Sequence, residues 1–276
     1  MHRSQLEMLL KALPATARRA GAAIMQVYAT DFAVRGKADE SPVTEADEFA
    51  ERIILADLAA LTPDIPVVSE EAFTKSGLPA ALAPVSDSAV SRIANLAAAT
   101  FWLVDPLDGT REFVRKNGEF TVNIALVERG VPILGVVYAP ALDALYAGAE
   151  GIGAFDGEGA SRRRISVRPP PSQGLTVLAS RSHGDEAALQ SYLSQRGEAV
   201  ASIERSGSSL KLCLLAAGQG DLYPRLGPTM EWDIAAGHAL LRAAGGRVTT
   251  MDGEELAYGK PEFENPHFVA TGGPAR

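Results

Sequence analysis

The segment FWLVDPLDGT, residues 101–110, places two aspartates directly after an apolar run. Residues 101–104 have the composition of a short buried strand, and a short helix is expected to begin near Thr110. Asp105 and Asp108 are three residues apart, so both carboxylates can converge on one point, and Gly109 permits a sharp turn. Such oxygen ligands suit Mg²⁺ or Mn²⁺ better than zinc. Alternatively, both aspartates only form a turn and cap a helix.

Other acidic residues also stand where an expected strand ends or an expected helix begins. Glu70 closes the apolar stretch 65–69, and Asp233 opens a helix expected over 233–244. Sites in α/β folds are built at such positions, so these acids are candidate partners of the two aspartates in 101–110. A solvated loop acid at Glu70 and a plain helix N-cap at Asp233 are the alternatives.

Composition limits the classes of protein to which the chain can belong. It has 276 residues, 46% of them hydrophobic, which excludes a disordered chain. The net charge of −8 argues against a nucleic-acid partner. One cysteine, Cys213, permits neither an internal disulfide nor a zinc cluster, and its leucine neighbours indicate burial. Without an apolar run of about 18 residues or a signal-peptide pattern, we expect a cytoplasmic protein with no integral membrane segment.

The periodicity of the chain predicts two different halves with a boundary near residue 160. The half 1–160 is expected to be α+β, with helices over 4–30 and 45–61 and strands over 65–69, 101–104, 120–127, 133–138 and 144–147. The half 161–276 is expected to be α/β, with helices over 185–196, 208–217 and 233–244 alternating with strands over 176–179, 199–204, 222–223, 247–250 and 268–271. The segment 72–99 is expected to be a loop and a short helix without assigned chemistry.

Three consecutive arginines, Arg162 to Arg164, lie at the expected boundary between these halves. Such a run is typical of a solvated linker. The alternative is that one of these arginines contacts an anion or a membrane surface.

Three segments together resemble a known family. Glu70, the segment 105–110 and the segment WDIAAG at 232–237 are similar to the signature segments of the inositol monophosphatase superfamily of Mg²⁺-dependent, lithium-sensitive phosphatases. The segment SPVTEAD at 41–47 resembles the start of the family's N-terminal helix. The order and spacing match from about residue 20 to 272. The resemblance implies a layered α-β-α-β-α sandwich with the active site between its two halves.

Further segments resemble one branch, the CysQ-type 3′(2′),5′-bisphosphate nucleotidases. They are GEFTVNIAL at 118–126, LGVVYAP at 134–140, and SSLK at 208–211 followed by LYPR at 222–225. The branch implies hydrolysis of the 3′-phosphate of adenosine 3′,5′-bisphosphate to AMP and phosphate, linked to sulfate assimilation. The alternatives are an inositol or sugar monophosphate phosphatase with the same metal core, and a non-catalytic metal-binding scaffold.

The resemblance also implies residue roles and cofactors. Two or three Mg²⁺ ions per site are expected, with Mn²⁺ as a substitute. The implied ligands are Glu70, Asp105 and the Leu107 carbonyl for one ion, and Asp105, Asp108 and Asp233 for another. Thr110, hydrogen-bonded to Asp47, would orient and deprotonate a water molecule that attacks phosphorus in line.

The implied partner is a small molecule, a bisphosphorylated nucleoside. Its expected contacts are Gly109, Thr110, His183, Ser208, Lys211 and Arg225. Lys211 and Arg225 would bind the second phosphate. A solvated helix face for Lys211, and surface loops for Arg225 and His183, are the alternatives. The sequence leaves open a homo-oligomer and a peripheral attachment to the inner face of the cell membrane.

Overall fold

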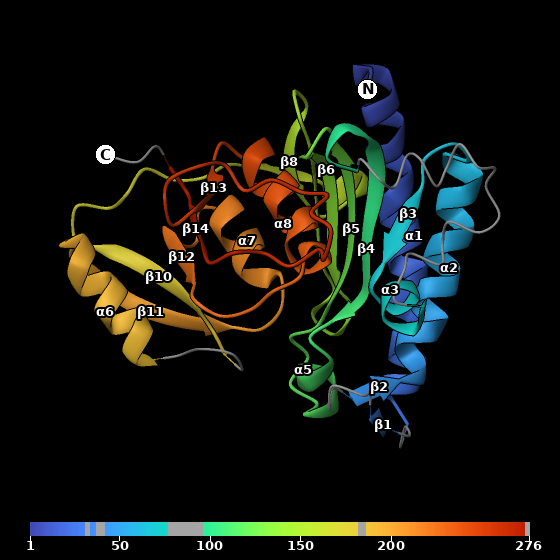
Figure 1. The fold of residues 1–276 in the computed structure, drawn as a ribbon, viewed down its shortest axis with the longest axis horizontal. Helices are drawn as coiled ribbons and strands as arrows, with labels where there is room; N and C mark the ends of the chain where they lie inside the picture. Colours follow the sequence, from blue (N-terminus) through green and yellow to red (C-terminus); the bar gives the residue numbers. More distant parts are fainter. Residues whose placement is uncertain (31–33, 37–41, 77–95, 182–185, 274–276) are drawn as a thin grey trace.

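Helices and sheets alternate in the order α-β-α-β-α (Figure 1). The computed structural model describes residues 1–30, 34–36, 42–76, 96–181 and 186–273. Helices α1 and α2 cover one face of a seven-stranded sheet, and α7 and α8 lie between this sheet and a five-stranded sheet. Helix α6 forms the outer layer beyond the second sheet. The layered sandwich expected from the sequence is therefore confirmed.

The first sheet has the strand order β3-β4-β5-β6-β7-β8-β9. Strand β3 runs parallel to β4, and every later neighbour pair is antiparallel. The elements of this half are α1 (Arg3–Tyr28), β1 (Val34–Gly36), β2 (Pro42–Thr44), α2 (Glu45–Leu61), β3 (Val67–Ser69), α3 (Glu70–Ser76), η2 (Leu96–Ala98), β4 (Thr100–Asp108), α5 (Thr110–Val114), β5 (Thr121–Glu128), β6 (Val131–Ala139), η3 (Pro140–Leu142), β7 (Ala144–Ala149), β8 (Gly153–Asp156), η4 (Gly159–Ser161) and β9 (Arg163–Ile165).

The second sheet has the strand order β11-β10-β12-β14-β13, with β10 parallel to both of its neighbours. Its elements are β10 (Leu175–Ser180), α6 (Glu186–Arg196), β11 (Val200–Ser206), α7 (Leu210–Ala216), β12 (Leu222–Arg225), α8 (Glu231–Ala243), β13 (Arg247–Thr250) and β14 (Phe268–Thr271). The helices and strands expected for this half are all present, with ends shifted by at most a few residues.

The central strands of the first sheet are buried on both faces. Alternate residues of a strand point to opposite faces. Accordingly, Trp102 and Val104 belong to the core under α1 and α2, whereas Phe101 and Leu103 belong to the core that includes α8. A strand with two buried faces reads as a continuous apolar run, which is why 101–104 was recognisable in the sequence. Cys213 lies in the second of these cores, as expected.

Strand β4 continues beyond the end that its apolar run indicates. We expected a strand ending at Val104, but pairing with β5 extends to Asp108. Asp105 lies opposite Asn123 and Asp108 opposite Thr121, so β4 contains one extra residue, a β-bulge. Pro106 is tolerated because the bulge interrupts the hydrogen-bond ladder. The two aspartates thus belong to the strand itself rather than to a loop after it.

The arginine run and the segment 72–99 differ in part from what the sequence predicts. The arginine run is not a linker, since Arg163 and Arg164 lie in β9, the last strand of the seven-stranded sheet. The boundary at residue 160 stays a prediction. Of the segment 72–99, α3 covers the start and η2 the end, while 77–95 lie outside the described residues.

Among the described residues, every helix is too short or too polar to cross a lipid bilayer.

Candidate active site

Acidic side chains from three elements meet at one end of the seven-stranded sheet. Strands β3 and β4 are parallel, with Ser69 opposite Val104, so the residues that follow, Glu70 and Asp105, emerge side by side. Asp108 ends β4, and Asp233 lies in the first turn of α8, which packs on β4. The sequence prediction that these acids come together is supported by their electrostatic influence on one another.

Burial and neighbouring negative charge destabilise the ionised acids. Burial raises the pKa of Asp105 well above its usual value, and the charges of Glu70 and Asp108 raise it further. Burial likewise raises the pKa of Asp233, with Asp108 and Glu70 as the next causes. In both cases the ionised group lacks enough compensating positive charge, which a bound cation would supply.

The donor chemistry of the cluster fits a hard divalent cation, because every side-chain ligand is a carboxylate. Within the part of the chain that the structure describes, however, no group of three His, Cys, Asp or Glu side chains is arranged to hold a metal ion. Among the described residues, the acids are therefore neighbours whose side chains do not converge on one point. The individual ligand assignments, including the carbonyl of the buried Leu107, stay predictions.

Asp108 is held by Ser208, which the sequence predicted as a substrate contact, and by Asn123 and Ser209, which the sequence analysis missed. Its Oδ2 accepts hydrogen bonds from Ser208 Oγ at 2.5 Å, Asn123 Nδ2 at 3.4 Å and Ser209 Oγ at 3.3 Å. Thr121 Oγ1 lies 2.6 Å from Ser208 Oγ. Thr121 and Asn123 are polar residues two apart in an otherwise apolar strand, hence on one face, and this spacing was the available signal.

The segment 206–208 joins this network to a second set of contacts. Ser208 has a positive φ of 52°, which is uncommon for a residue with a side chain. Glu119 Oε2 accepts a 2.8 Å hydrogen bond from the Gly207 amide, and Arg181 donates to both Glu119 oxygens at 2.7 and 2.8 Å. Burial opposes ionisation of Glu119, but these donors hold its pKa below the usual value. Glu119, in the loop that precedes β5, thus holds the segment 206–208 in place.

The two basic residues predicted to bind substrate are buried. Lys211 is 3% exposed, and its Nζ donates to the Ser206 carbonyl at 3.1 Å and the Ser208 carbonyl at 2.5 Å. Burial lowers the pKa of Lys211 to about 8, partly offset by Asp108. Arg225 is 8% exposed and donates from Nη2 to the Pro228 carbonyl at 2.7 Å. The solvated-face and surface-loop alternatives for these two residues are therefore wrong.

One donor of Arg225 has no partner within the described part of the protein. Among the described residues, its Nε is buried and has no hydrogen-bond partner. A buried donor without a partner is costly, and functional sites are a common reason for it. Arg225 also influences both Lys211 and Asp233 electrostatically, so it lies near the acidic cluster.

The remaining predicted residues have mixed outcomes. Thr110 begins α5 and follows Gly109, whose φ of 89° requires a glycine-like conformation. Asp47 is buried in the first turn of α2, and its charge contributes to the raised pKa of Asp105. A hydrogen bond between Thr110 and Asp47 stays a prediction. His183 lies outside the described residues.

Comparison with known proteins identifies the class. A model described as the inositol monophosphatase family matches residues 5–271. The match spans nearly the whole chain, so this protein belongs to the inositol monophosphatase family. The family, together with the layered fold and the carboxylate cluster, defines a metal-dependent phosphatase.

Individual relatives are similar over most of their length. The chain is 50% identical over 258 residues to the 3′(2′),5′-bisphosphate nucleotidase CysQ of Escherichia coli O157:H7, covering 91% of this chain and 95% of that protein. The crystal structure of CysQ from Bacteroides thetaiotaomicron has a TM-score of 0.77 and 34% identity, with 98% of both chains covered. An inositol monophosphatase from Anabaena (Nostoc) sp. PCC 7120 has a TM-score of 0.71 and 26% identity, covering 98% of this chain and 92% of that one. The resemblance stated from the sequence is confirmed.

Proposed function

We propose that this protein is a 3′(2′),5′-bisphosphate nucleotidase that hydrolyses the 3′-phosphate of adenosine 3′,5′-bisphosphate. Water oxygen bonds to phosphorus as the P–O3′ bond breaks, giving AMP and phosphate. The chain's similarity to CysQ nucleotidases across most of its length supports this activity. The reaction fits a role in sulfate assimilation and an enzyme that acts in the cytoplasm.

We assign the cofactor as Mg²⁺, held by Glu70, Asp105, Asp108, Asp233 and the Leu107 carbonyl. When bound, Mg²⁺ lowers the pKa of the attacking water and neutralises charge on the phosphoryl oxygens. The protein's own contribution begins with Asp108, whose carboxylate is oriented by Asn123, Ser208 and Ser209. Thr110 and Asp47 are proposed to orient the water and accept its proton.

Arg225 carries the argument for a substrate with two phosphates. A monophosphate bound at the acidic cluster gives the buried Nε of Arg225 nothing to bind, whereas a second phosphate can accept from it. The buried ammonium of Lys211 adds positive charge to the same region. An inositol or sugar monophosphate phosphatase would leave the Nε of Arg225 without a partner.

A phosphate-release assay of Arg225→Ala tests this assignment. The substrates are adenosine 3′,5′-bisphosphate, inositol monophosphate and fructose 1,6-bisphosphate, each with Mg²⁺, with Mg²⁺ and Li⁺, and with EDTA. We expect kcat/KM for the adenosine bisphosphate to fall on the order of 100-fold, mainly through KM, because a charged hydrogen bond contributes about 1.5–3 kcal/mol. Turnover of the monophosphate should change little.

Arg225→Lys is the matched variant for this assay, since it keeps the charge but loses Nε. An intermediate loss is expected, because a lysine cannot reproduce a bidentate contact. If Arg225→Ala slows all three substrates equally, the nucleotidase assignment fails. Binding of Mg²⁺ with no release of phosphate from any substrate would instead favour the scaffold hypothesis.

A further inference from the structure

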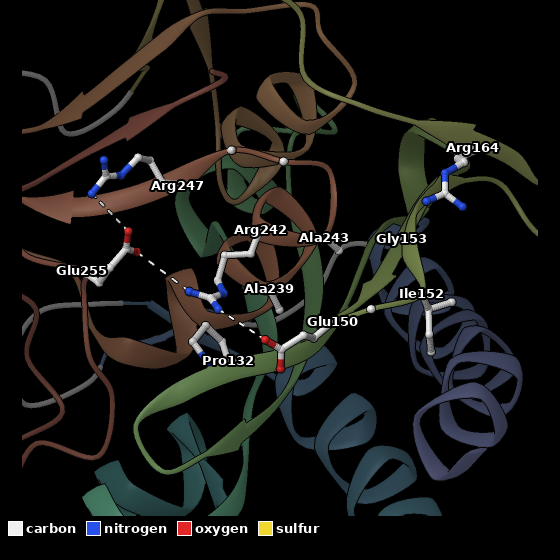
Figure 2. Close-up of a pocket in the computed structure, with 13 residues that line it drawn as sticks. Pro132, Glu150, Ile152, Gly153, Arg164, Ala239, Arg242, Ala243, Arg247 and Glu255 are labelled. Carbon is white, nitrogen blue, oxygen red and sulfur yellow. Dashed lines mark ion pairs between the residues drawn. The ribbon is translucent and has the colours of Figure 1, made fainter. Parts of the chain in front are cut away.

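A cavity of about 540 Å³ lies at the C-terminal end of α8, opposite the end that carries Asp233. Its walls come from that helix end, the turn between β7 and β8, and strands β9 and β13 (Figure 2). Asp233 and Arg242 are nine residues apart on α8, about 13 Å along the helix axis. The cavity is thus separate from the candidate active site and large enough for a small ligand.

Arginines dominate the polar lining of this cavity. Arg164, Arg242 and Arg247 face Glu150 and Glu255, which gives three positive charges against two negative ones. This local excess of positive charge occurs in a chain whose net charge is −8. A cavity with these charges favours an anionic ligand over a cationic one.

The ion pairs across the cavity are loose. Arg242 lies 3.7 Å from Glu150 and 3.9 Å from Glu255, while Arg247 lies 3.2 Å from Glu255. Among the described residues, none of these pairs meets hydrogen-bond geometry, and the buried Nε of Arg247 has no partner. Partly exposed pairs of this kind contribute little to stability, so guanidinium donors remain available.

Arg164 stands on the opposite wall. Figure 2 shows its guanidinium directed toward the cavity, away from the chain of ion pairs formed by the other two arginines. A Cβ on Gly153 would lie 2.6 Å from Arg164 Nη2, so the guanidinium rests against backbone that only glycine leaves open. Gly153 has a φ of 118°, which also disfavours any other residue. No ion pair of Arg164 occurs among the residues that the structure describes.

We propose that this cavity is a binding site for a small organic anion that carries two phosphate groups. One phosphate would bind Arg164, and the other would bind Arg242 and Arg247, whose loose carboxylate partners it replaces in part. Arginine suits this task because its planar fork matches phosphate oxygens. This site does not depend on the proposed nucleotidase reaction, since none of its residues belongs to the catalytic cluster.

Isothermal titration calorimetry with inorganic pyrophosphate tests the proposal on the full-length protein in EDTA. Metal removal leaves the catalytic acids uncompensated, so they repel the probe at the active site. We expect one pyrophosphate per chain and a Kd about tenfold weaker or more in Arg164→Gln, because charge-assisted hydrogen bonds are lost. Arg247→Gln should weaken binding similarly.

Arg163→Gln is the matched control, because Arg163 precedes Arg164 on β9, points to the opposite face of the strand and pairs with Asp156. Its Kd should equal that of the unsubstituted protein. The phosphatase kcat/KM of Arg164→Gln should also be unchanged, which shows that the variant is folded. The proposal is overturned if pyrophosphate does not bind, if Arg164→Gln and Arg163→Gln give the same Kd, or if Arg225→Ala abolishes binding instead.

Discussion

Carboxylates predominate at the N-terminal end of α8 and arginines at its C-terminal end, and the two groups differ in burial. At its N-terminus, Asp233 belongs to a carboxylate cluster in which burial raises the pKa values of Asp105 and Asp233. At its C-terminus, Arg242 belongs to a group of arginines that are partly exposed and loosely paired. The negative Asp233 and the positive Arg242 also complement the helix dipole, which is positive at the N-terminus and negative at the C-terminus.

Burial, more than the number of charges, decides how strongly each end of α8 needs a counter-ion. Enclosed carboxylates lose the solvation that stabilises their ionised form, so a cation is required for all of them to stay charged. The arginines keep part of their hydration and tolerate long ion pairs. We therefore infer that the acidic end needs a bound cation, whereas the arginine end suits a reversible ligand.

The largest effect is expected on catalysis, from the substitution Asp108→Asn in the acidic cluster. The substitution keeps the shape of the side chain but removes charge from the cluster. We expect kcat/KM for adenosine 3′,5′-bisphosphate to fall on the order of 10³-fold, which corresponds to about 4 kcal/mol of transition-state stabilisation. Phosphate release measures it. Asp64→Asn, in the exposed turn before β3, is the control and should retain full activity.

A smaller effect is expected from disturbing the packing of the middle of α8 on β6, because this packing positions both ends of the helix. A Cβ on Gly135 of β6 would overlap the Ala236 carbonyl oxygen. Gly135→Ala should therefore destabilise the protein by at least about 3 kcal/mol, since backbone must shift to relieve the overlap. Urea unfolding measures this loss. Gly148→Ala, whose Cβ would lie 3.2 Å from the same helix, should cost less, and equal losses would contradict the packing described here.

His238 lies in the middle of α8, and the pH dependence of stability tests whether its side chain is buried. It is fully buried, with Nδ1 2.9 Å from the Tyr258 hydroxyl, and burial lowers its pKa to about 3. Because the folded state disfavours the protonated ring, stability is complete above the unfolded pKa of about 6.5 and falls as the pH drops toward 3.

In the pH window from 6.5 to 3, this histidine should reduce the free energy of unfolding by about 1.4 kcal/mol per pH unit, or about 2 kcal/mol at pH 5. His238→Asn removes the titrating group, so its stability should depend less steeply on pH. Urea unfolding at pH 7 and pH 5 compares the two proteins. Parallel pH profiles would show that His238 is not buried in its neutral form.

The smallest effect is expected on the melting temperature of Asp105→Asn, which tests whether the acids at the N-terminal end of α8 repel one another. Asp105→Asn removes a carboxylate whose ionised form is destabilised by burial and by the charges of Glu70 and Asp108, so the metal-free protein should melt about 2 °C higher or more. Differential scanning calorimetry in EDTA measures this shift. Mg²⁺ should raise the Tm of the unsubstituted protein but not that of the variant. A lower Tm for metal-free Asp105→Asn would argue against repulsion among the acids.

Local sequence patterns predicted the elements that position the acids. Apolar runs and helical periodicity gave β3, β4 and α8 because each element buries a regular set of side chains. The extension of β4 through Pro106 was missed because a bulge, which local pattern does not reveal, accommodates the proline. The resemblance to a family supplied the ligand roles, which composition and spacing alone left open.

Contacts between distant segments could not be derived from the sequence. Asn123 and Ser209 meet at Asp108 only because β5 and the start of α7 pack together in the fold. The burial of Lys211 was likewise hidden, since its position at a helix start also suits a solvated side chain. The arginine cavity combines residues from β9, α8 and β13, and only Arg164 was marked beforehand, as one of two alternatives.

The acids of β4, α3 and α8 are the proposed ligands of the divalent cation. A crystal structure of the Mn²⁺-soaked protein, measured for anomalous scattering, shows whether they bind it. We expect manganese peaks within about 2.5 Å of oxygens from Glu70, Asp105, Asp108 or Asp233, each ion bound by at least two of them. Manganese bound elsewhere in an active enzyme, with none of these carboxylates as a ligand, would rule out this metal site.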